Sequence, residues 1–308
     1  MSIILRVGPA HQSRWKSTLA AQLPELGVRL WDEPGNDEDI RYAVVWRPPA
    51  GGLRRFTNLE CIVSIGAGID HVYADPELPA VPIIKTVGNV LRQRMREYVC
   101  AQVLRFHRGL DLLDEAAARS QWAPRADPPA DQRVVGIMGL GSMGLLCAQT
   151  LASLGFAVHA WTRSPRAVPD IKTWAGPAEF DDFLATVDIL VCLLPLTDAT
   201  RSILSAKTFS RLKPDACLIN VGRGDHLVED DLIPALESGQ LRAAALDVFQ
   251  IEPLPQEHPF WDHPNVHVTP HVASLISPDL GATLIANNLR RFIAGESVPD
   301  LVPVGRGY

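Results

Sequence analysis

Short apolar runs alternate with longer amphipathic stretches through most of the chain. Within each run the apolar residues are continuous, which is typical of strands buried on both faces of a parallel sheet. The repeated order of strand and then helix predicts right-handed βαβ units in doubly wound sheets. Two series of strands are predicted: Ile3–Val7, Val28–Trp31, Ala43–Trp46, Cys61–Ile65 and Ile83–Lys85, and then Val134–Met138, Ala157–Trp161, Ile189–Leu193, Cys217–Val221, Ala243–Leu246 and Val266–Thr269.

The stretch between the two series predicts a division of the chain. A single long helix is expected over Gln93–Arg119, and the segment WAPRADPPADQR that follows is rich in proline and charge, like a linker. We therefore expect an α/β fold with two domains joined by a helix. A last helix, expected over Pro278–Ala294, can pack on either domain.

Composition narrows the class of protein. The 308 residues are 47% hydrophobic and 21% charged, with a net charge of −6, which is typical of a globular protein of enzyme size. The chain has no basic surplus, so nucleic acid is not an expected partner. The start, MSIILRVGPA, lacks the features of a secretory signal, and no apolar stretch approaches the roughly 20 residues that cross a bilayer. We expect neither a membrane partner nor export.

The five cysteines are scattered and odd in number, and four lie in apolar runs such as ILVCLLP. This pattern favours buried, reduced thiols in a cytoplasmic protein over disulfides or a metal site.

A glycine-rich turn opens the second domain. The predicted strand Val134–Met138 runs into GLGSMG, and a helix is expected to follow. In that context, G-x-G-x-x-G predicts a dinucleotide site. Gly139 allows the tight turn, Gly141 admits a pyrophosphate, and Gly144 lets helix and strand pack closely, while the N–H groups of Ser142 and Met143 face the phosphates. A glycine-rich turn without a ligand is the alternative.

Two further segments bear on the cofactor. The next strand ends in WTRSPR, without the carboxylate that usually binds the ribose hydroxyls of NAD. Arg163 and Ser164 suit a 2′-phosphate instead, so NADPH is predicted over NADH, which stays possible; Arg163 can also be a solvated surface residue. Leu194 and Pro195, in LLPLT, are expected to line the cofactor, to cap the strand end, or both.

Four polar residues follow predicted strands in order: Arg223 in NVGRGD, Asp247 and Glu252 in ALDVFQIEPLP, and His271 in TPHVAS. Ligands of open α/β sheets bind beyond the carboxyl ends of strands, so these side chains can converge. A histidine donates protons near neutral pH, a carboxylate orients it, and an arginine clamps a substrate carboxylate. The set predicts a 2-oxoacid reductase.

Each of these residues also has a structural interpretation. Arg223 can be a turn residue, or part of an Arg-Gly-Asp adhesion motif, which would need an extracellular protein. Glu252 can open a proline-rich loop, and His271 can be a core histidine. The ordered set downstream of a dinucleotide turn favours the catalytic interpretation.

The motifs GLGSMG, NVGRG, ALDVFQIEPLP and TPHVAS resemble those of the D-isomer-specific 2-hydroxyacid dehydrogenase family. The segments AVVWRPP, IGAGIDHV, LPLT, VEDDLIPALESG and the terminal RGY are similar to its bacterial glyoxylate/hydroxypyruvate reductase A branch. The resemblance spans nearly the whole chain. It implies a discontinuous substrate domain, 1–94 plus 276–308, a Rossmann domain, 95–275, closure around the substrate, and a homodimer.

The resemblance also implies roles for individual residues. Arg223 matches the arginine that binds the substrate carboxylate and oxo group, His271 the proton donor, and Glu252 its acidic partner. Asp247 matches a residue near the nicotinamide carboxamide. In the first domain, the loop of Ala67 and Gly68 matches one that binds the carboxylate through backbone amides, and Trp46 an aromatic of the substrate pocket.

One stretch, TVGNVLRQRMREY, departs from that branch because it carries Arg92, Arg94 and Arg96. Arg92 can attract a second acidic group on the substrate; a solvated start of the helix is the favoured interpretation.

The sequence thus predicts NADPH-dependent reduction of a small 2-oxoacid, of the glyoxylate or hydroxypyruvate type, to the (R)-2-hydroxyacid. One rival keeps the fold and acts on a larger or phosphorylated oxoacid, or in the oxidative direction. Another is a dinucleotide-sensing binding protein without turnover.

Overall fold

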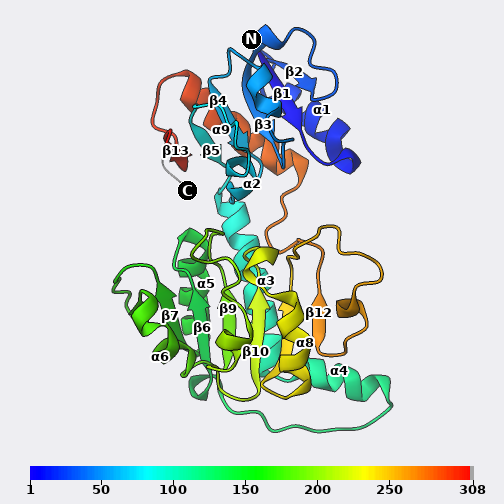
Figure 1. Cartoon of the computed structure of the whole chain (residues 1–308), viewed down its shortest axis with the longest axis vertical. Coiled ribbons are helices and arrows are strands. Elements are labelled where there is room, and N and C mark those ends of the chain that lie inside the picture. Colours follow the sequence, from blue (N-terminus) through cyan, green and yellow to red (C-terminus); the bar gives the residue numbers. More distant parts are fainter. Residues whose placement is uncertain (306–308) are drawn as a thin grey trace. The chain divides into compact units, whose positions relative to one another are not determined.

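The structure is a computed structural model that describes residues 1–305, so the RGY motif at 306–308 lies outside the described residues. The chain forms two compact units, Met1–Leu91 with the chain from Ile276 onward, and Arg92–Leu275 (Figure 1). The division after Leu91 falls within a helix, α3 (Asn89–His107), as does the predicted boundary at 94/95.

The first unit contains a six-stranded sheet in the order β13-β5-β4-β3-β1-β2. Its strands are β1 (Ser2–Arg6), β2 (Gly27–Leu30), β3 (Ile40–Val45), β4 (Cys61–Ser64), β5 (Ile83–Lys85) and β13 (Leu301–Val302). All pair in parallel except β13, which is antiparallel to β5. The helices are α1 (Gln12–Gln22), α2 (Asp70–Tyr73) and α9 (Pro278–Ile293).

Helix α9 belongs to this unit although it lies more than 250 residues after α1 in the sequence. The two helices approach closely at Gly281, where a β-carbon would lie 2.2 Å from the ring of Trp15. Arg14 and Asp279 form an ion pair across the same contact. The apolar pattern left open which domain the last helix packs on. This packing places it in the first unit.

The second unit contains a seven-stranded, fully parallel sheet in the order β12-β11-β10-β9-β6-β7-β8. Its strands are β6 (Val134–Met138), β7 (Ala157–Thr162), β8 (Ile171–Ala175), β9 (Ile189–Cys192), β10 (Ala216–Asn220), β11 (Leu241–Leu246) and β12 (Val266–Val268). The helices are α3, α4 (Leu110–Ala118), α5 (Ser142–Ser153), α6 (Phe180–Leu184), α7 (Ala206–Phe209) and α8 (Glu229–Glu237).

Both faces of this sheet are covered, as the continuous apolar runs predict. Alternate residues of β9 enter different cores: Ile189 and Val191 pack with residues of α3 and α5, whereas Leu190 and Cys192 pack with residues of α6, α7 and α8. Successive side chains of a strand point to opposite faces, so a run that is apolar throughout requires helices on both sides. The doubly wound α/β architecture is confirmed.

Three details differ from the sequence-based expectation. The helix predicted over Gln93–Arg119 is two helices, because Gly109 has φ +56°, a left-handed conformation that ends the α3 segment and starts α4. Strands β8 and β13 were not predicted. Both are edge strands: β8 is mostly only partly buried and β13 has two residues, so neither presents a long apolar run.

Candidate active site

Six adjacent strands of the second sheet, β12-β11-β10-β9-β6-β7, end at the same edge of the sheet, because all of them pair in parallel. Ligands of open α/β sheets bind at this edge. The predicted site residues of this unit follow those strand ends: His271 after β12, Asp247 and Glu252 after β11, Arg223 after β10, Leu194 and Pro195 after β9, Gly139 after β6, and Arg163 after β7.

The glycine turn between β6 and α5 has the geometry that a dinucleotide needs. Gly139 adopts φ +98°, and a β-carbon on Gly144 would lie 1.9 Å from the Gly139 carbonyl oxygen. A β-carbon on Gly141 would meet no atom within 4 Å, so the turn is open there to an approaching group. Helix α5 begins at Ser142, so the N–H groups of Ser142 and Met143 have no acceptor within the helix. Pyrophosphate fits this opening.

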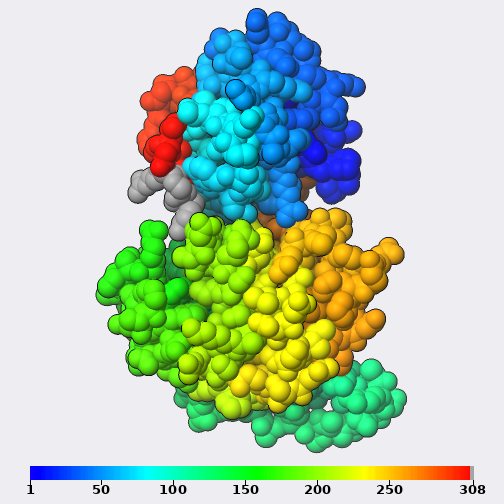
Figure 2. All heavy atoms as spheres, in the orientation of Figure 1, coloured from blue at the N-terminus to red at the C-terminus, as the bar shows by residue number. Residues whose placement is uncertain are grey.

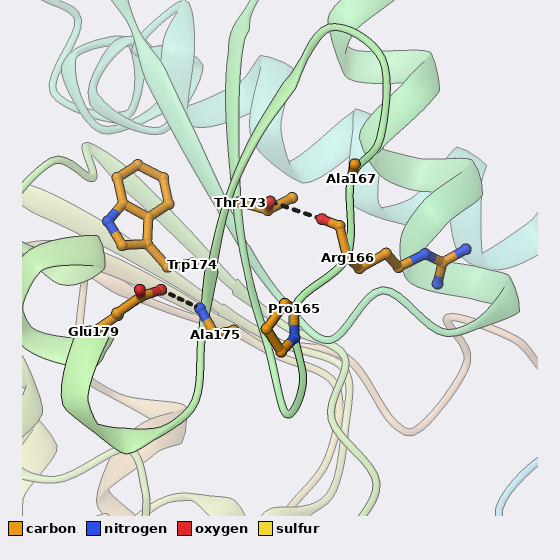
Figure 3. A pocket seen from close by; sticks show the side chains of 7 residues that line it. All are labelled: Pro165, Arg166, Ala167, Thr173, Trp174, Ala175 and Glu179. Atoms are coloured by element: carbon orange, nitrogen blue, oxygen red, sulfur yellow. Dashed lines mark hydrogen bonds between the residues drawn. The ribbon is translucent and has the colours of Figure 1, made fainter.

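The segment after β7 lies beside the glycine turn. Arg166 Nη1 donates to the carbonyl oxygen of Leu140 at 2.5 Å, and Thr162 Oγ1 donates to the carbonyl oxygen of Ser164 at 2.9 Å. Arg163 and Ser164 are exposed. A neighbouring pocket has a volume of about 380 Å³. Figure 3 shows the residues that line it: Pro165, Arg166, Ala167, Thr173, Trp174, Ala175 and Glu179. Its one carboxylate, on Glu179, accepts the Ala175 N–H at 2.6 Å.

Arg223 follows β10, and its backbone is held by two fully buried side chains. Asn220 Nδ2 donates to the Arg223 carbonyl oxygen at 3.0 Å, and the Arg223 N–H donates to His226 Nδ1 at 2.9 Å. The guanidinium donates to the carbonyl oxygen of Gly222 at 2.7 Å. Sequence reasoning missed Asn220 and His226; Asn220 is a buried polar residue at a strand end, which is the signal that could have identified it.

The Arg-Gly-Asp tripeptide has structural partners at each position. A β-carbon on Gly224 would lie 1.9 Å from the backbone of Phe249, so this glycine permits close packing of two loops. Asp225 forms an ion pair with Arg201 at 2.6 Å. The glycine is buried and the aspartate is paired, which does not match an adhesion loop.

His271 and Glu252 are paired. His271 Nδ1 lies 2.9 Å from Glu252 Oε2, and Glu252 Oε1 accepts the Phe249 N–H at 3.1 Å. The histidine side chain is 31% exposed and the glutamate 16%, so the pair is shielded and still reachable. His271 has φ +54°, a conformation that costs energy for a residue with a β-carbon and is kept only by its surroundings.

Asp247 holds the backbone around His271. The His271 N–H donates to the Asp247 carbonyl oxygen at 2.9 Å, while the Asp247 carboxylate accepts the N–H groups of Val272 and Ala273 and the hydroxyl of Thr269. Asp247 is 1% exposed. Burial raises the pKa of Asp247, and the hydrogen bonds from Thr269, Ala273 and Val272 oppose that rise. Its predicted contact with the nicotinamide stays a prediction.

The predicted substrate residues of the first unit lie close to one another within that unit. The ring of Trp46 lies 4.4 Å from that of His71, and a β-carbon on Gly66 would lie 2.9 Å from Trp46. Ser64 Oγ lies 3.1 Å from His71 Nε2 and donates to the Gly68 carbonyl oxygen at 3.0 Å. Ala67 and Gly68 are partly exposed. His71, which sequence reasoning missed, thus braces both Trp46 and the loop.

Within residues 1–305 no group of three His, Cys, Asp or Glu side chains is arranged to hold a metal ion. None of the helices that the structure describes combines the length and apolar character needed to cross a membrane. The three arginines that depart from the family pattern lie on α3. Arg94 is exposed, and Arg92 and Arg96 are partly buried.

Comparison with known proteins identifies the family. Residues 100–273 match the model of the D-isomer specific 2-hydroxyacid dehydrogenase NAD binding domain. Glyoxylate/hydroxypyruvate reductase A of Serratia proteamaculans is 40% identical over 100% of both chains, and that of Yersinia enterocolitica 36% identical over 100% of both.

Solved structures agree with the sequence comparison. A D-isomer specific 2-hydroxyacid dehydrogenase from Xanthobacter autotrophicus, in complex with NADPH and MES, superposes with a TM-score of 0.92 at 38% identity, covering 100% of this chain and 99% of that one. An NADPH-dependent glyoxylate/hydroxypyruvate reductase from Sinorhizobium meliloti, in complex with NADP and sulfate, gives 0.89 at 37% identity over 98% of each chain. With its glycine turn and its ordered Arg223, Glu252 and His271, this chain belongs to the D-isomer specific 2-hydroxyacid dehydrogenase family.

Proposed function

We propose that the protein is an NADPH-dependent reductase that converts a small 2-oxoacid, of the glyoxylate or hydroxypyruvate type, to the (R)-2-hydroxyacid. The observation that carries the proposal is the His271–Glu252 pair, which lies on the same sheet edge as Arg223 and the dinucleotide turn. The relative from Serratia proteamaculans is named a glyoxylate/hydroxypyruvate reductase, and that from Sinorhizobium meliloti an NADPH-dependent glyoxylate/hydroxypyruvate reductase, which supports the proposal.

NADPH is the cofactor that the chain's residues fit best, with NADH as a possible substitute. The open backbone at Gly141 and the first turn of α5 suit the pyrophosphate. Arg163 and Ser164 follow β7 in the sequence WTRSPR, which contains no acidic residue, and they suit the 2′-phosphate. Leu194, Pro195 and Asp247 are assigned to the cofactor as well. When bound, the nicotinamide supplies the hydride that reduces the 2-oxo carbon.

The protein's own residues bind the substrate and move the proton. The Arg223 guanidinium binds the substrate carboxylate and polarises the adjacent oxo group. Glu252 fixes the His271 ring by accepting from Nδ1, and its negative charge stabilises the imidazolium form. His271 then transfers a proton from Nε2 to the oxygen that becomes the hydroxyl. His271 regains a proton from solvent, which completes the consumption of one proton per product.

Residues of the first unit complete substrate recognition in this proposal. The backbone N–H groups of the loop of Ala67 and Gly68 bind the substrate carboxylate, and Trp46 contacts the rest of the acid. We assign the substrate function to residues 1–94 plus 276–308 and the cofactor function to residues 95–275.

The assembly and location are also proposed. A homodimer is supported by the segment around α4, which projects from the second unit (Figure 2). This segment carries Trp122, which is 97% exposed, and Leu110, which is 44% exposed. Large exposed apolar side chains in one segment mark an interaction surface. A cytoplasmic location is supported by the five cysteines, all of which are unpaired thiols.

The test is to follow the nicotinamide absorbance of purified protein with glyoxylate or hydroxypyruvate, and with NADPH and NADH in parallel. We expect rapid loss with NADPH and slower loss with NADH. Equal rates would contradict the role of Arg163 and leave the chemistry in place. No loss with any 2-oxoacid, including larger and phosphorylated ones, would overturn the reductase assignment in favour of a dinucleotide-binding protein without turnover.

A further inference from the structure

His226 is a completely buried histidine next to the proposed substrate arginine. It is the last residue of the short 3-10 helix Gly224–His226, whose N-cap is Arg223, and its exposed fraction is 0%. Its ring lies against Gly222, where a β-carbon would meet Nδ1 at 2.7 Å. The polar atoms of a buried imidazole need hydrogen-bond partners, so the partners of its two ring nitrogens indicate the role of the residue.

The two ring nitrogens contact different segments. Nδ1 accepts the Arg223 N–H at 2.9 Å, and Nε2 lies 3.3 Å from the carbonyl oxygen of Pro195, in the loop after β9. A nitrogen that accepts from an N–H carries no proton, so the proton of the neutral ring is on Nε2 and is donated to Pro195. Only this one neutral form of the ring satisfies both contacts.

The remaining contacts make the Arg223 peptide rigid. The His226 N–H donates to the Arg223 carbonyl oxygen at 3.2 Å, and Asn220 Nδ2 donates to the same oxygen. Asn220 Oδ1 in turn accepts the Gly222 N–H at 3.2 Å. Both backbone groups of Arg223 are thus held from the buried side, which leaves its side chain as the part that can reach a ligand.

We propose that His226, as the neutral Nε2–H tautomer, is a positioning residue that joins the substrate arginine to the loop of Pro195. This inference rests on the proposed function, in which Arg223 binds the oxoacid and Pro195 lines the cofactor. His226 touches neither ligand; it transmits the position of each segment to the other through two hydrogen bonds.

Two variants separate the two bonds. In His226→Asn the amide oxygen takes the place of Nδ1 and keeps the acceptor for Arg223, while the bond to Pro195 is lost. In His226→Gln the longer amide keeps a donor for Pro195 and loses the acceptor at Nδ1. His263→Gln is a matched control, because His263 Nδ1 also accepts a backbone N–H, that of Asn265 at 3.2 Å, outside the site.

We expect His226→Gln to raise KM for the oxoacid about tenfold while KM for NADPH stays within about twofold, since a buried N–H loses its acceptor. For His226→Asn we expect the opposite result: KM for the oxoacid stays within about twofold of the wild-type value, and KM for NADPH rises about fivefold. The control should match the wild type. Variants that change both constants by the same factor, or neither, would overturn the proposal.

Two measurements do not depend on turnover, so they separate failure of this inference from failure of the proposed function. Hydrogen–deuterium exchange of the Arg223 amide should be about tenfold faster in His226→Gln than in the wild type or His226→Asn. If the variants do not fold, nitrogen-15 spectra of imidazole-labelled wild type decide the question. An Nε2–H tautomer at pH 7.5 supports the proposal, and an Nδ1–H tautomer or a charged ring refutes it.

Discussion

His271 Nδ1 lies 2.9 Å from Glu252 Oε2, and the second carboxylate oxygen of Glu252 is held by the N–H of Phe249. The glutamate is therefore fixed by the backbone before it orients the histidine. The same stretch of backbone packs on Gly224, so the loop that carries the acid and the loop that carries Arg223 are in van der Waals contact. A displacement of either loop would disturb both parts of the site.

Glu252→Gln keeps the shape of the side chain and removes its charge. We expect kcat for oxoacid reduction to fall about 100-fold, because the imidazolium loses its stabilising partner, as is typical when acid–base catalysis is impaired. Steady-state kinetics with NADPH measures this. Glu257→Gln, an exposed glutamate of the same loop, is the control and should leave kcat unchanged. A wild-type kcat in the Glu252 variant would eliminate the proposed pair.

Arg223→Gln removes the proposed carboxylate clamp. We expect kcat/KM for the oxoacid to fall about 1,000-fold, since a charge-assisted contact and the polarisation of the oxo group are lost together. NADPH binding, followed by fluorescence, should stay within about twofold. The control is Arg201→Gln, because Arg201 lies close by in an exposed ion pair with Asp225. Equal losses in the two variants would point to general disruption of the loop.

Arg163→Ala tests the cofactor assignment. We expect KM for NADPH to rise about 30-fold and KM for NADH to stay constant, because only NADPH has the 2′-phosphate with which a charged hydrogen bond forms. Arg166→Ala should instead weaken the binding of both cofactors, since Arg166 donates a hydrogen bond to the glycine turn at Leu140. If Arg163→Ala affected NADH and NADPH equally, the 2′-phosphate role would be wrong.

The buried ion pair between Arg242 and Asp111 attaches α4 to the sheet. Its side chains are 16% and 6% exposed, and Arg242 also donates to the Phe106 carbonyl oxygen. Asp111→Asn leaves a buried guanidinium without its counter-charge, so the free energy of unfolding should fall by about 3 kcal/mol in urea titrations. Arg211→Gln, which breaks an exposed pair with Asp181, should cost less than about 1 kcal/mol. Similar losses for both would contradict the importance of burial.

Four buried thiols predict how stability depends on pH. Burial raises the pKa of Cys61, Cys147, Cys192 and Cys217 to about 12. The unfolded chain ionises these groups near pH 8.5, so between about 8.5 and 12 it holds fewer protons than the folded chain, and the free energy of unfolding falls as pH rises.

The prediction for these thiols is checked with Cys192→Ala. The loss of unfolding free energy between pH 8 and pH 10 should be smaller in this variant than in the wild type, whatever its stability at pH 8. Chemical denaturation at both pH values measures the difference. An unchanged pH dependence would show that Cys192 is not protected from ionisation in the folded state.

The sequence alone determined the architecture and the order in which the predicted site residues follow the strands. Continuous apolar runs require sheets that are covered on both faces. The glycine spacing of GLGSMG, between a strand and a helix, predicts a turn that a phosphate can approach. Both features can be inferred from the sequence. The order of Arg223, Glu252 and His271 after successive strands likewise places them at one sheet edge, because parallel strands end together.

Tertiary structure alone decided which residues support that site. The motifs do not give His226, Asn220 and His71 a role, and their roles appear when the hydrogen bonds between segments are traced. The apolar pattern of the sequence also did not predict the helix break at Gly109, the edge strands β8 and β13, or the packing of α9 against α1. The physical reason is the range of the interactions. Periodicity and turn chemistry act between neighbours in the chain, whereas partners of buried polar groups and helix contacts depend on which distant segments the fold brings together.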